Sequence, residues 1–392
     1  MSKINEARAL KLVMDLMAIP GASCHEGRVA SAIVDFLKSH GVPESAIHSD
    51  TAHRRTPQRG AVGNLIVKLP SSLRTPRIML SAHMDTVPIC VGAVPKRAGT
   101  TIVSSDAKTG LGGDDRAGVA TVLIAAVETL ESGVELPPLT LCFFIQEEIG
   151  LQGSRNLSAA KLGKVAMAFN FDGSSPTKLT VGATGGERLK IVLHGLAAHA
   201  GLAPAAGASA IHAAGIAIAS LHRDGWLGAV KKGKQIGTSN IGVIQGGAAT
   251  NVVCDRVEIE AEARSHDGSF RDSIAGAIAQ AFEQAATKIK STDGTAVRAE
   301  IARRVDYESF RLTDDDPAVV AAVAAIAAVG GEPTLAVSNG GLDANWLVRH
   351  GIPTVTLGCG QRSIHTTSES LDIADYFTAC RIAKQLITHA TR

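Results

Sequence analysis

The chain has 392 residues, of which 45% are hydrophobic and 19% are charged, and its formal net charge is +2. This composition supports a sizeable core and excludes broad disorder, and the length predicts two or three domains. The near-neutral charge gives no electrostatic reason to expect a nucleic acid or an anionic membrane as a partner.

The N-terminal segment and the cysteines predict a cytoplasmic protein. Residues 1–17 carry charges throughout and contain no uninterrupted apolar core of a signal peptide. The longest apolar stretches fall short of the ~20 residues that a membrane-spanning helix needs. The six cysteines lie far apart without a CxxC pair, so we expect reduced cysteines that pack in the core.

The apolar pattern along the chain predicts an α/β domain. Residues 5–18 and 26–39 have the spacing of helices. From about residue 61, short β-branched runs alternate with long helical segments. The predicted strands are 63–69, 77–85, 139–148, 165–173 and 353–360, and the predicted helices are 114–133, 316–331 and 369–390. Fully apolar strands between helices are typical of a sheet that is covered on both faces.

Residues 183–305 follow a different pattern, which predicts an inserted domain. Their predicted elements follow the order βαββαβ, the ferredoxin-like arrangement. The strands alternate apolar and polar residues, as expected for a sheet with one solvated face. We therefore expect a catalytic domain in two parts, 1–182 and 306–392, interrupted by this insertion.

Acidic and histidine side chains recur where the predicted strands end. Ligands of open α/β sheets bind outside the carboxyl ends of the strands. The residues at these positions are His83, Asp85, Glu147, Glu148, Asp172 and His365, with Asp114 and Asp115 in a glycine-rich turn that opens a helix. Mixed histidine and carboxylate ligation suits zinc, manganese or cobalt, and two such ions would offset the clustered acids. Singly, a buried histidine is more often a hydrogen-bonded core residue than a ligand, and an aspartate after a strand, such as Asp114 or Asp115, is more often a helix N-cap.

Other catalytic motifs are absent from the sequence. There is no HExxH, no GxSxG and no Walker loop, and the glycine-rich stretches "TGLGGD" and "GATGGE" match no full dinucleotide fingerprint. We interpret both stretches as turns, and the basic stretch 53–59 as a solvated loop.

The ordered motifs "SAHMDT", "GGDDRAG", "QEEIG", "NFDG", "AAHAG", "NGGLDAN" and "IHTTSES" resemble those of the peptidase T-like co-catalytic di-zinc metallopeptidases, relatives of the aminoacylases, glutamate carboxypeptidases and desuccinylases. The resemblance covers essentially the whole chain. It implies a zinc-exopeptidase-type α/β catalytic domain with an inserted ferredoxin-like lid that also pairs subunits. One departure is "SCHEGR" at 23–28, which replaces the family's small glycine-rich turn.

The resemblance also implies roles for individual residues. His83 and Asp172 would hold one metal ion, Glu148 and His365 would hold the other, and Asp114 would bridge the two. The further implied roles are general base for Glu147, orientation of an imidazole for Asp85, oxyanion stabilisation for His199, and substrate binding for Asn251, Arg264, Asn339 and Gly340. Without the resemblance, His199 could equally be an ordinary loop histidine. Arg264 would be better explained as a surface arginine on a strand, and 338–345 as an ordinary turn before a helix.

The implied activity is removal of the N-terminal residue from short peptides, tripeptides in particular, by a cytoplasmic homodimer. Zinc is the usual metal of the family, and cobalt or manganese are alternatives. Asp172, where desuccinylases and glutamate carboxypeptidases typically carry glutamate, favours the aminopeptidase side. The alternatives are an N-acyl amino acid deacylase or carboxypeptidase of the same superfamily, and a non-catalytic peptide-binding protein.

Overall fold

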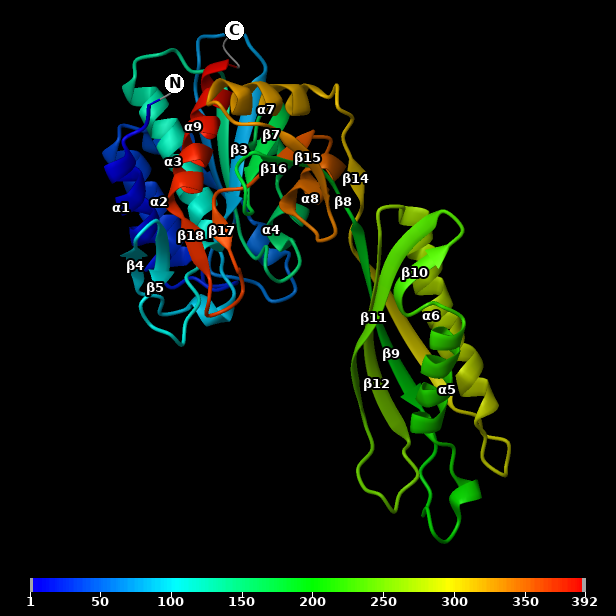
Figure 1. Cartoon of the computed structure of the whole chain (residues 1–392). Helices are drawn as coiled ribbons and strands as arrows, with labels where there is room; N and C mark the ends of the chain where they lie inside the picture. The colour runs from blue at the N-terminus through cyan, green and yellow to red at the C-terminus, as the bar shows by residue number, and fades with distance from the viewer. Residues whose placement is uncertain (1–2, 390–392) are drawn as a thin grey trace. The chain divides into compact units, whose positions relative to one another are not determined.

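The computed structural model describes residues 3–389 and divides them into two compact units (Figure 1). Unit 1 contains 3–182, 311–338 and 342–389, and unit 2 contains 183–310 and 339–341. Residue 390, the last of the predicted C-terminal helix, lies outside the described residues. Among residues 3–389, no helix is long and apolar enough to cross a membrane.

Unit 1 is built around a mixed sheet in the order β1-β2-β6-β3-β7-β16-β8-β14, with β15 paired to β8. Strands β6, β3, β7 and β16 run parallel to one another, and β2 and β8 flank them antiparallel. The strands are β1 (Ile47–Ser49), β2 (Leu65–Leu69), β3 (Arg77–His83), β6 (Leu139–Phe144), β7 (Val165–Phe171), β8 (Lys178–Ala183), β14 (Phe310–Arg311), β15 (Thr334–Ser338) and β16 (Thr354–Leu357).

One helix of unit 1 is buried on all sides. It is α3 (Gly113–Glu131), which packs on β3 and β7 and also contacts α1 and α9. Its residues from 113 to 129 are all buried, and the middle of the helix, 117–127, is apolar on every side apart from Thr121 instead of amphipathic. The other helices of the unit are α1 (Glu6–Met17), α2 (Gly27–Ser39), α4 (Gln152–Arg155), α7 (Pro317–Ala328), α8 (Asp343–Arg349) and α9 (Ile373–His389).

A small second sheet in unit 1 was not expected from the sequence. Its order is β17-β18-β5-β4, from β4 (Pro95–Ala98), β5 (Thr101–Ser104), β17 (Gln361–Arg362) and β18 (Ser370–Asp372). These strands have two to four residues and are largely exposed or half-buried, so they lack the apolar run that predicts a strand. Strand β18 takes the first residues of the predicted helix 369–390, and α9 begins only at Ile373.

Unit 2 is an antiparallel sheet with two helices on one side (Figure 1). Its elements are β9 (Gly185–His194), α5 (Ala210–Arg223), β10 (Gly228–Lys232), β11 (Gln235–Gly246), β12 (Arg256–Ser265), α6 (Gly268–Lys288) and β13 (Arg298–Tyr307). The sheet order is β10-β11-β12-β9-β13. Without β10, this order and the βαββαβ connectivity are those of a ferredoxin-like fold. The predicted fold class, an α/β domain with a ferredoxin-like insertion, is confirmed.

The extent of unit 2 differs from the predicted insertion of 183–305. Residue 305 lies within β13, which pairs with β9 as far as Tyr307, and the unit continues to Phe310. Asn339–Gly341 also belongs to unit 2, although the chain has already returned to unit 1 at residue 311. An added Cβ at Gly341 would lie 2.7 Å from the ring of Tyr307, so the close approach of this loop to β13 needs glycine.

Candidate active site

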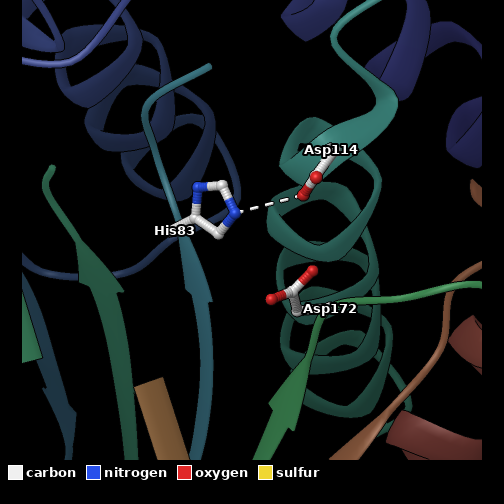
Figure 2. A group of neighbouring side chains, drawn as sticks. All are labelled: His83, Asp114 and Asp172. Atoms are coloured by element: carbon white, nitrogen blue, oxygen red, sulfur yellow. Dashed lines mark hydrogen bonds and ion pairs between the residues drawn. The ribbon is translucent and has the colours of Figure 1, made fainter. Parts of the chain in front are cut away.

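The first group of possible metal ligands lies where two neighbouring parallel strands end. His83 is the last residue of β3, and Asp172 directly follows β7. Asp114 reaches the same point from the start of α3, and its Oδ1 lies 3.2 Å from His83 Nε2 (Figure 2). Potential ligand atoms of these three residues all lie within 4.8 Å of one another. The three side chains therefore form a candidate site for one metal ion.

A second group shares Asp114 with the first. His365 Nε2 lies 3.0 Å from Glu148 Oε1 and 3.1 Å from Asp114 Oδ2, and potential ligand atoms of these three residues also lie within 4.8 Å of one another. Asp114 thus directs Oδ1 to His83 and Oδ2 to His365. His365 has a φ of 63°, a left-handed conformation that non-glycine residues adopt rarely and that is frequent at functional sites.

Both histidines of the two groups are set among carboxylates. Burial disfavours the charged form of His83, but its hydrogen bonds with Asp114 and Asp85 outweigh burial and raise the pKa of His83 well above its usual value. Contacts with Asp114 and Glu148 raise the pKa of His365 to about 10. Without a metal ion, each imidazole is therefore doubly protonated and positively charged at neutral pH, and a bound metal ion would displace one of the two protons.

The acids of the site outnumber its cations. Burial raises the pKa of Glu147 well above its usual value, and Asp343, Asp172 and Glu148 add to this shift by repulsion. Burial and the carboxylate of Asp114 do the same to Asp172. Clustered buried carboxylates are costly unless a positive charge compensates them, which is the electrostatic condition that favours a bound dication.

Asp85, two residues after β3, connects the end of that strand with the segment that follows β6. It is fully buried, and its Oδ1 accepts the backbone N–H of Glu147 at 2.9 Å. Its Oδ2 accepts the N–H of Glu148 at 3.2 Å and the hydroxyl of Ser23 at 2.6 Å. His83 Nδ1 lies 3.4 Å from Asp85 Oδ1. Asp85 therefore fixes the position of the imidazole and of the backbone that carries both glutamates.

Glu369 has a comparable bracing function that the sequence did not reveal. Its Oε2 accepts the backbone N–H groups of Leu111 and Gly112 at 2.8 Å, and its Oε1 accepts that of Asp114 at 3.1 Å. The buried carboxylate thus fixes the turn that presents Asp114. Its sequence signal is weak, because a glutamate four residues after a histidine has no distinctive spacing.

Asp115 and Gln361 form a further brace. Asp115 Oδ2 accepts the N–H of His83 at 3.1 Å, and its Oδ1 accepts the N–H of Gly118 at 3.0 Å, as a helix cap does. Gln361 donates to Asp115 Oδ1 at 2.8 Å and accepts the N–H of Gly173 at 2.9 Å. The ordinary N-terminal helix role considered for the two aspartates therefore falls to Asp115.

The predicted substrate residues lie in unit 2. His199 is exposed, and its Nδ1 accepts the N–H groups of Gly201 and Leu202 at 3.2 and 3.1 Å. Arg264 and Asn339 line one cavity of about 190 Å³, where Asn339 Oδ1 lies 2.9 Å from His266 Nε2. The other two, Asn251 and Gly340, lie in loops of the same unit. Their roles towards the strand-end residues of unit 1 stay predictions.

The sequence matches peptidase family M20/M25/M40 over residues 79–389. The chain belongs to this family. Aminopeptidase PepT from Bacillus cereus has a solved structure that matches with a TM-score of 0.87 and 31% identity, over 99% of this chain and 100% of that one. A tripeptidase structure from Staphylococcus aureus matches with a TM-score of 0.89 and 30% identity, over 99% of each chain.

Some relatives are named carboxypeptidases instead of aminopeptidases. A probable carboxypeptidase from Uncinocarpus reesii is 28% identical over 72% of this chain and 67% of its own length. The family match and the two full-length structural matches confirm the resemblance to peptidase T-like enzymes. At the level of the family, the protein is an M20 peptidase.

Proposed function

We propose that this M20 peptidase is a two-metal aminopeptidase that releases the N-terminal residue from short peptides, tripeptides in particular. The observation that carries the proposal is the pair of ligand groups joined through Asp114, with the carboxyl group of Glu147 close enough to interact with the charges of His83 and Asp172. The names of the two full-length structural matches, aminopeptidase and tripeptidase, support the choice of substrate.

The donor set fits two zinc-like dications. It combines imidazole and carboxylate groups with no thiolate, and its excess of buried acid calls for positive charge. His83 and Asp172 would hold one ion, Glu148 and His365 the other, and Asp114 both. Bound ions of this kind lower the pKa of a water molecule and polarise a substrate carbonyl group.

Glu147 is the proposed general base. A carboxyl group beside the proposed metal ligands can take a proton from water and then donate it to the departing amine. The backbone of Glu147 is fixed by Asp85 through the 2.9 Å hydrogen bond, so the point from which the side chain extends is set before substrate binds. From unit 2, His199 would stabilise the oxyanion, and Asn251, Arg264, Asn339 and Gly340 would bind the rest of the peptide.

We also propose a cytoplasmic homodimer. The six free cysteines support a reducing compartment. Beyond residue 239, β11 has no partner strand on its outer side among residues 3–389, and Ile244 on this stretch is 51% exposed. An open, apolar strand edge favours pairing with a second copy. Sedimentation velocity measures the oligomeric state directly.

The test combines metal content with paired substrates. We expect two metal ions per chain, cleavage of a free tripeptide, and no cleavage of the same tripeptide with an acetylated N-terminus. Glu147→Gln should retain both metal ions and lose at least 10²-fold in kcat, the range of general acid–base catalysis. Metal binding with full activity of Glu147→Gln would contradict the role of Glu147.

The name of the fungal relative favours carboxypeptidase activity as a second candidate. A carboxypeptidase accepts the acetylated tripeptide and rejects the tripeptide amide, whereas an aminopeptidase shows the opposite preference. Cleavage of the acetylated peptide alone would therefore replace the aminopeptidase proposal.

A further inference from the structure

The backbone of the paired glutamates is held by two buried carboxylates. Asp85 accepts the N–H groups of Glu147 and Glu148. The N–H of the preceding residue, Gln146, is accepted by Glu26 Oε1 at 3.0 Å. Three consecutive N–H groups, from 146 to 148, therefore all bind buried carboxylate oxygens. Glu26 comes from the 23–28 stretch, where the sequence departs from the usual turn of peptidase T-like enzymes.

Glu26 Oε1 binds two residues with the same unusual backbone conformation. It accepts the N–H of Cys24 at 3.0 Å as well as that of Gln146. Gln146 has a φ of 52° and Cys24 a φ of 75°, both in the left-handed region that non-glycine residues avoid on steric grounds. The conformation of Gln146 sets the direction in which the chain enters Glu147.

The burial of Glu26 is costly, which argues that it has a specific role. The residue is 0% exposed, and its Oε2 makes no hydrogen bond among the described residues. Burial, and then the nearby charge of Asp85, raise the pKa of Glu26 to about 7. Arg116 is also buried, and its positive charge interacts with the carboxylates of Glu26 and Asp85. Its Nε and Nη1 have no hydrogen-bond partner among the described residues. A packed apolar side chain would avoid this cost, but it could not accept the N–H of Gln146.

We propose that Glu26 is a positioning residue for the general base: by accepting the N–H of Gln146, it holds this residue in the left-handed conformation that aims Glu147 at the reacting water. The inference rests on the proposed role of Glu147. Among the described residues, the carboxylate of Glu26 accepts only the backbone N–H groups of Cys24 and Gln146, so its role would be positioning.

The test uses the full-length, metal-loaded chain and a free tripeptide. Glu26→Gln keeps an acceptor oxygen and the length of the side chain, so kcat should stay within about threefold of wild type. Glu26→Asp keeps the charge but is one methylene shorter, so it cannot reach both N–H groups. We expect Glu26→Asp and Glu26→Leu to lose at least tenfold in kcat, with KM and metal content unchanged.

A second substitution separates positioning from general stability. Glycine adopts positive φ without steric cost, so Gln146→Gly in the Glu26→Leu background should restore kcat at least fivefold. Gln146→Gly alone serves as the reference, because it also removes the 3.0 Å hydrogen bond from the Gln146 amide to the carbonyl of Arg59. Glu44→Leu, at a side chain that is 82% exposed, controls for loss of an acid elsewhere.

Two outcomes would overturn the inference: wild-type kcat in both Glu26→Asp and Glu26→Leu, or no recovery on adding Gln146→Gly. If Glu26→Leu does not fold, a kcat of Glu26→Asp no lower than that of Glu26→Gln overturns it as well. Glu147→Gln is measured in the same series. Full activity of that variant contradicts the proposed function, whereas an inactive Glu147→Gln beside fully active Glu26→Asp and Glu26→Leu contradicts only the positioning role.

Discussion

The guanidinium group of Arg264 already has a carboxylate partner on its own strand. Arg264 Nε lies 3.0 Å from Glu262 Oε1, and Nη2 lies 2.9 Å from Glu262 Oε2, so the Nε–Nη2 edge of the guanidinium group is already paired. If Arg264 binds the C-terminal carboxylate of the peptide through this edge, Glu262 competes with the substrate from within the protein. The affinity for substrate is then set by the balance between two carboxylates.

This competition gives a prediction for KM. Glu262→Gln removes the charge of the competitor, so KM for a free tripeptide should fall three- to tenfold while kcat stays constant. The measurement is steady-state kinetics with the tripeptide and with its C-terminal amide, whose KM should not change. Glu258→Gln is the matched control, because Glu258 is the acid four residues earlier on β12 and pairs with Arg256. Equal effects on acid and amide would contradict the competition.

The histidines of the candidate metal site predict a pH-dependent metal affinity. The pKa of His365 is raised to about 10 and that of His83 is raised well above its usual value, so both are protonated at neutral pH without metal. A metal ion binds only the neutral imidazole, so zinc must displace these protons. The apparent affinity should therefore rise with pH from 6 towards 10, by roughly tenfold per pH unit for each proton released.

Titration calorimetry in two buffers of different ionisation enthalpy counts the protons released. We expect a release at pH 7 that falls by about one proton in His365→Ala. His212→Ala, at an exposed histidine on α5, should leave the count unchanged. A metal affinity that does not depend on pH between 6 and 8 would show that the histidines are not ligands.

At the scale of elements, the close contact of α3 with the end of β7 holds Asp114 and Asp172 together. A Cβ added to Gly118 would collide with the carbonyl oxygen of Phe171 and with the carboxylate of Asp115. Glycine is required here by the distance between helix and strand, although it weakens a helix interior.

Gly118→Ala should therefore destabilise unit 1 by about 3 kcal/mol, the upper end of the usual overpacking cost. It should also weaken metal binding, because it moves α3 away from Asp172. Gly215→Ala in α5 is the matched control, since no atom lies within 4 Å of its added Cβ. That variant should gain up to about 1 kcal/mol from helix propensity. Thermal unfolding measures both, and equal unfolding temperatures would contradict the packing argument.

The elements that the sequence predicted share one property: a regular apolar pattern, continuous in the buried strands of unit 1 and alternating in the strands of unit 2. Strand β6 is buried along all six residues, and α3 is buried along most of its length, so hydrophobic patterning marks both. The small sheet of β4, β5, β17 and β18 went unpredicted because it joins short, partly exposed segments from distant parts of the chain. Its contacts exist only in the folded unit.

The residues of the candidate site also divide into those that the sequence located and those that it did not. Its strand-end acids and histidines could be located because parallel strands bring their carboxyl ends to one edge. Glu369 and Glu26 could not be, because their partners are backbone N–H groups: Glu369 binds Asp114, 255 residues away, and Glu26 binds Gln146, 120 residues away. A backbone N–H belongs to every residue except proline, so it leaves no mark in the sequence.

At the scale of the whole molecule, the two units have separate cores. The core of unit 2 gathers 23 buried hydrophobic residues between Leu189 and Val297, all from its own chain segment. A distinct cluster from Ile66 to Ile352 lies in unit 1. Both candidate metal groups belong to unit 1 alone. Metal binding should therefore stabilise one unit and leave the other unchanged.

This separation predicts two unfolding transitions that respond differently to metal. A ligand that binds only the folded state stabilises it by about 4 kcal/mol at a thousand times its dissociation constant. Calorimetry with and without zinc should therefore show one transition that shifts upward with zinc and one that does not move. Asp172→Ala, which removes a proposed ligand, should abolish most of the shift, whereas Glu262→Gln in unit 2 should keep it. A single transition that moves as a whole would mean that the two units unfold together and that metal binding in unit 1 also stabilises unit 2.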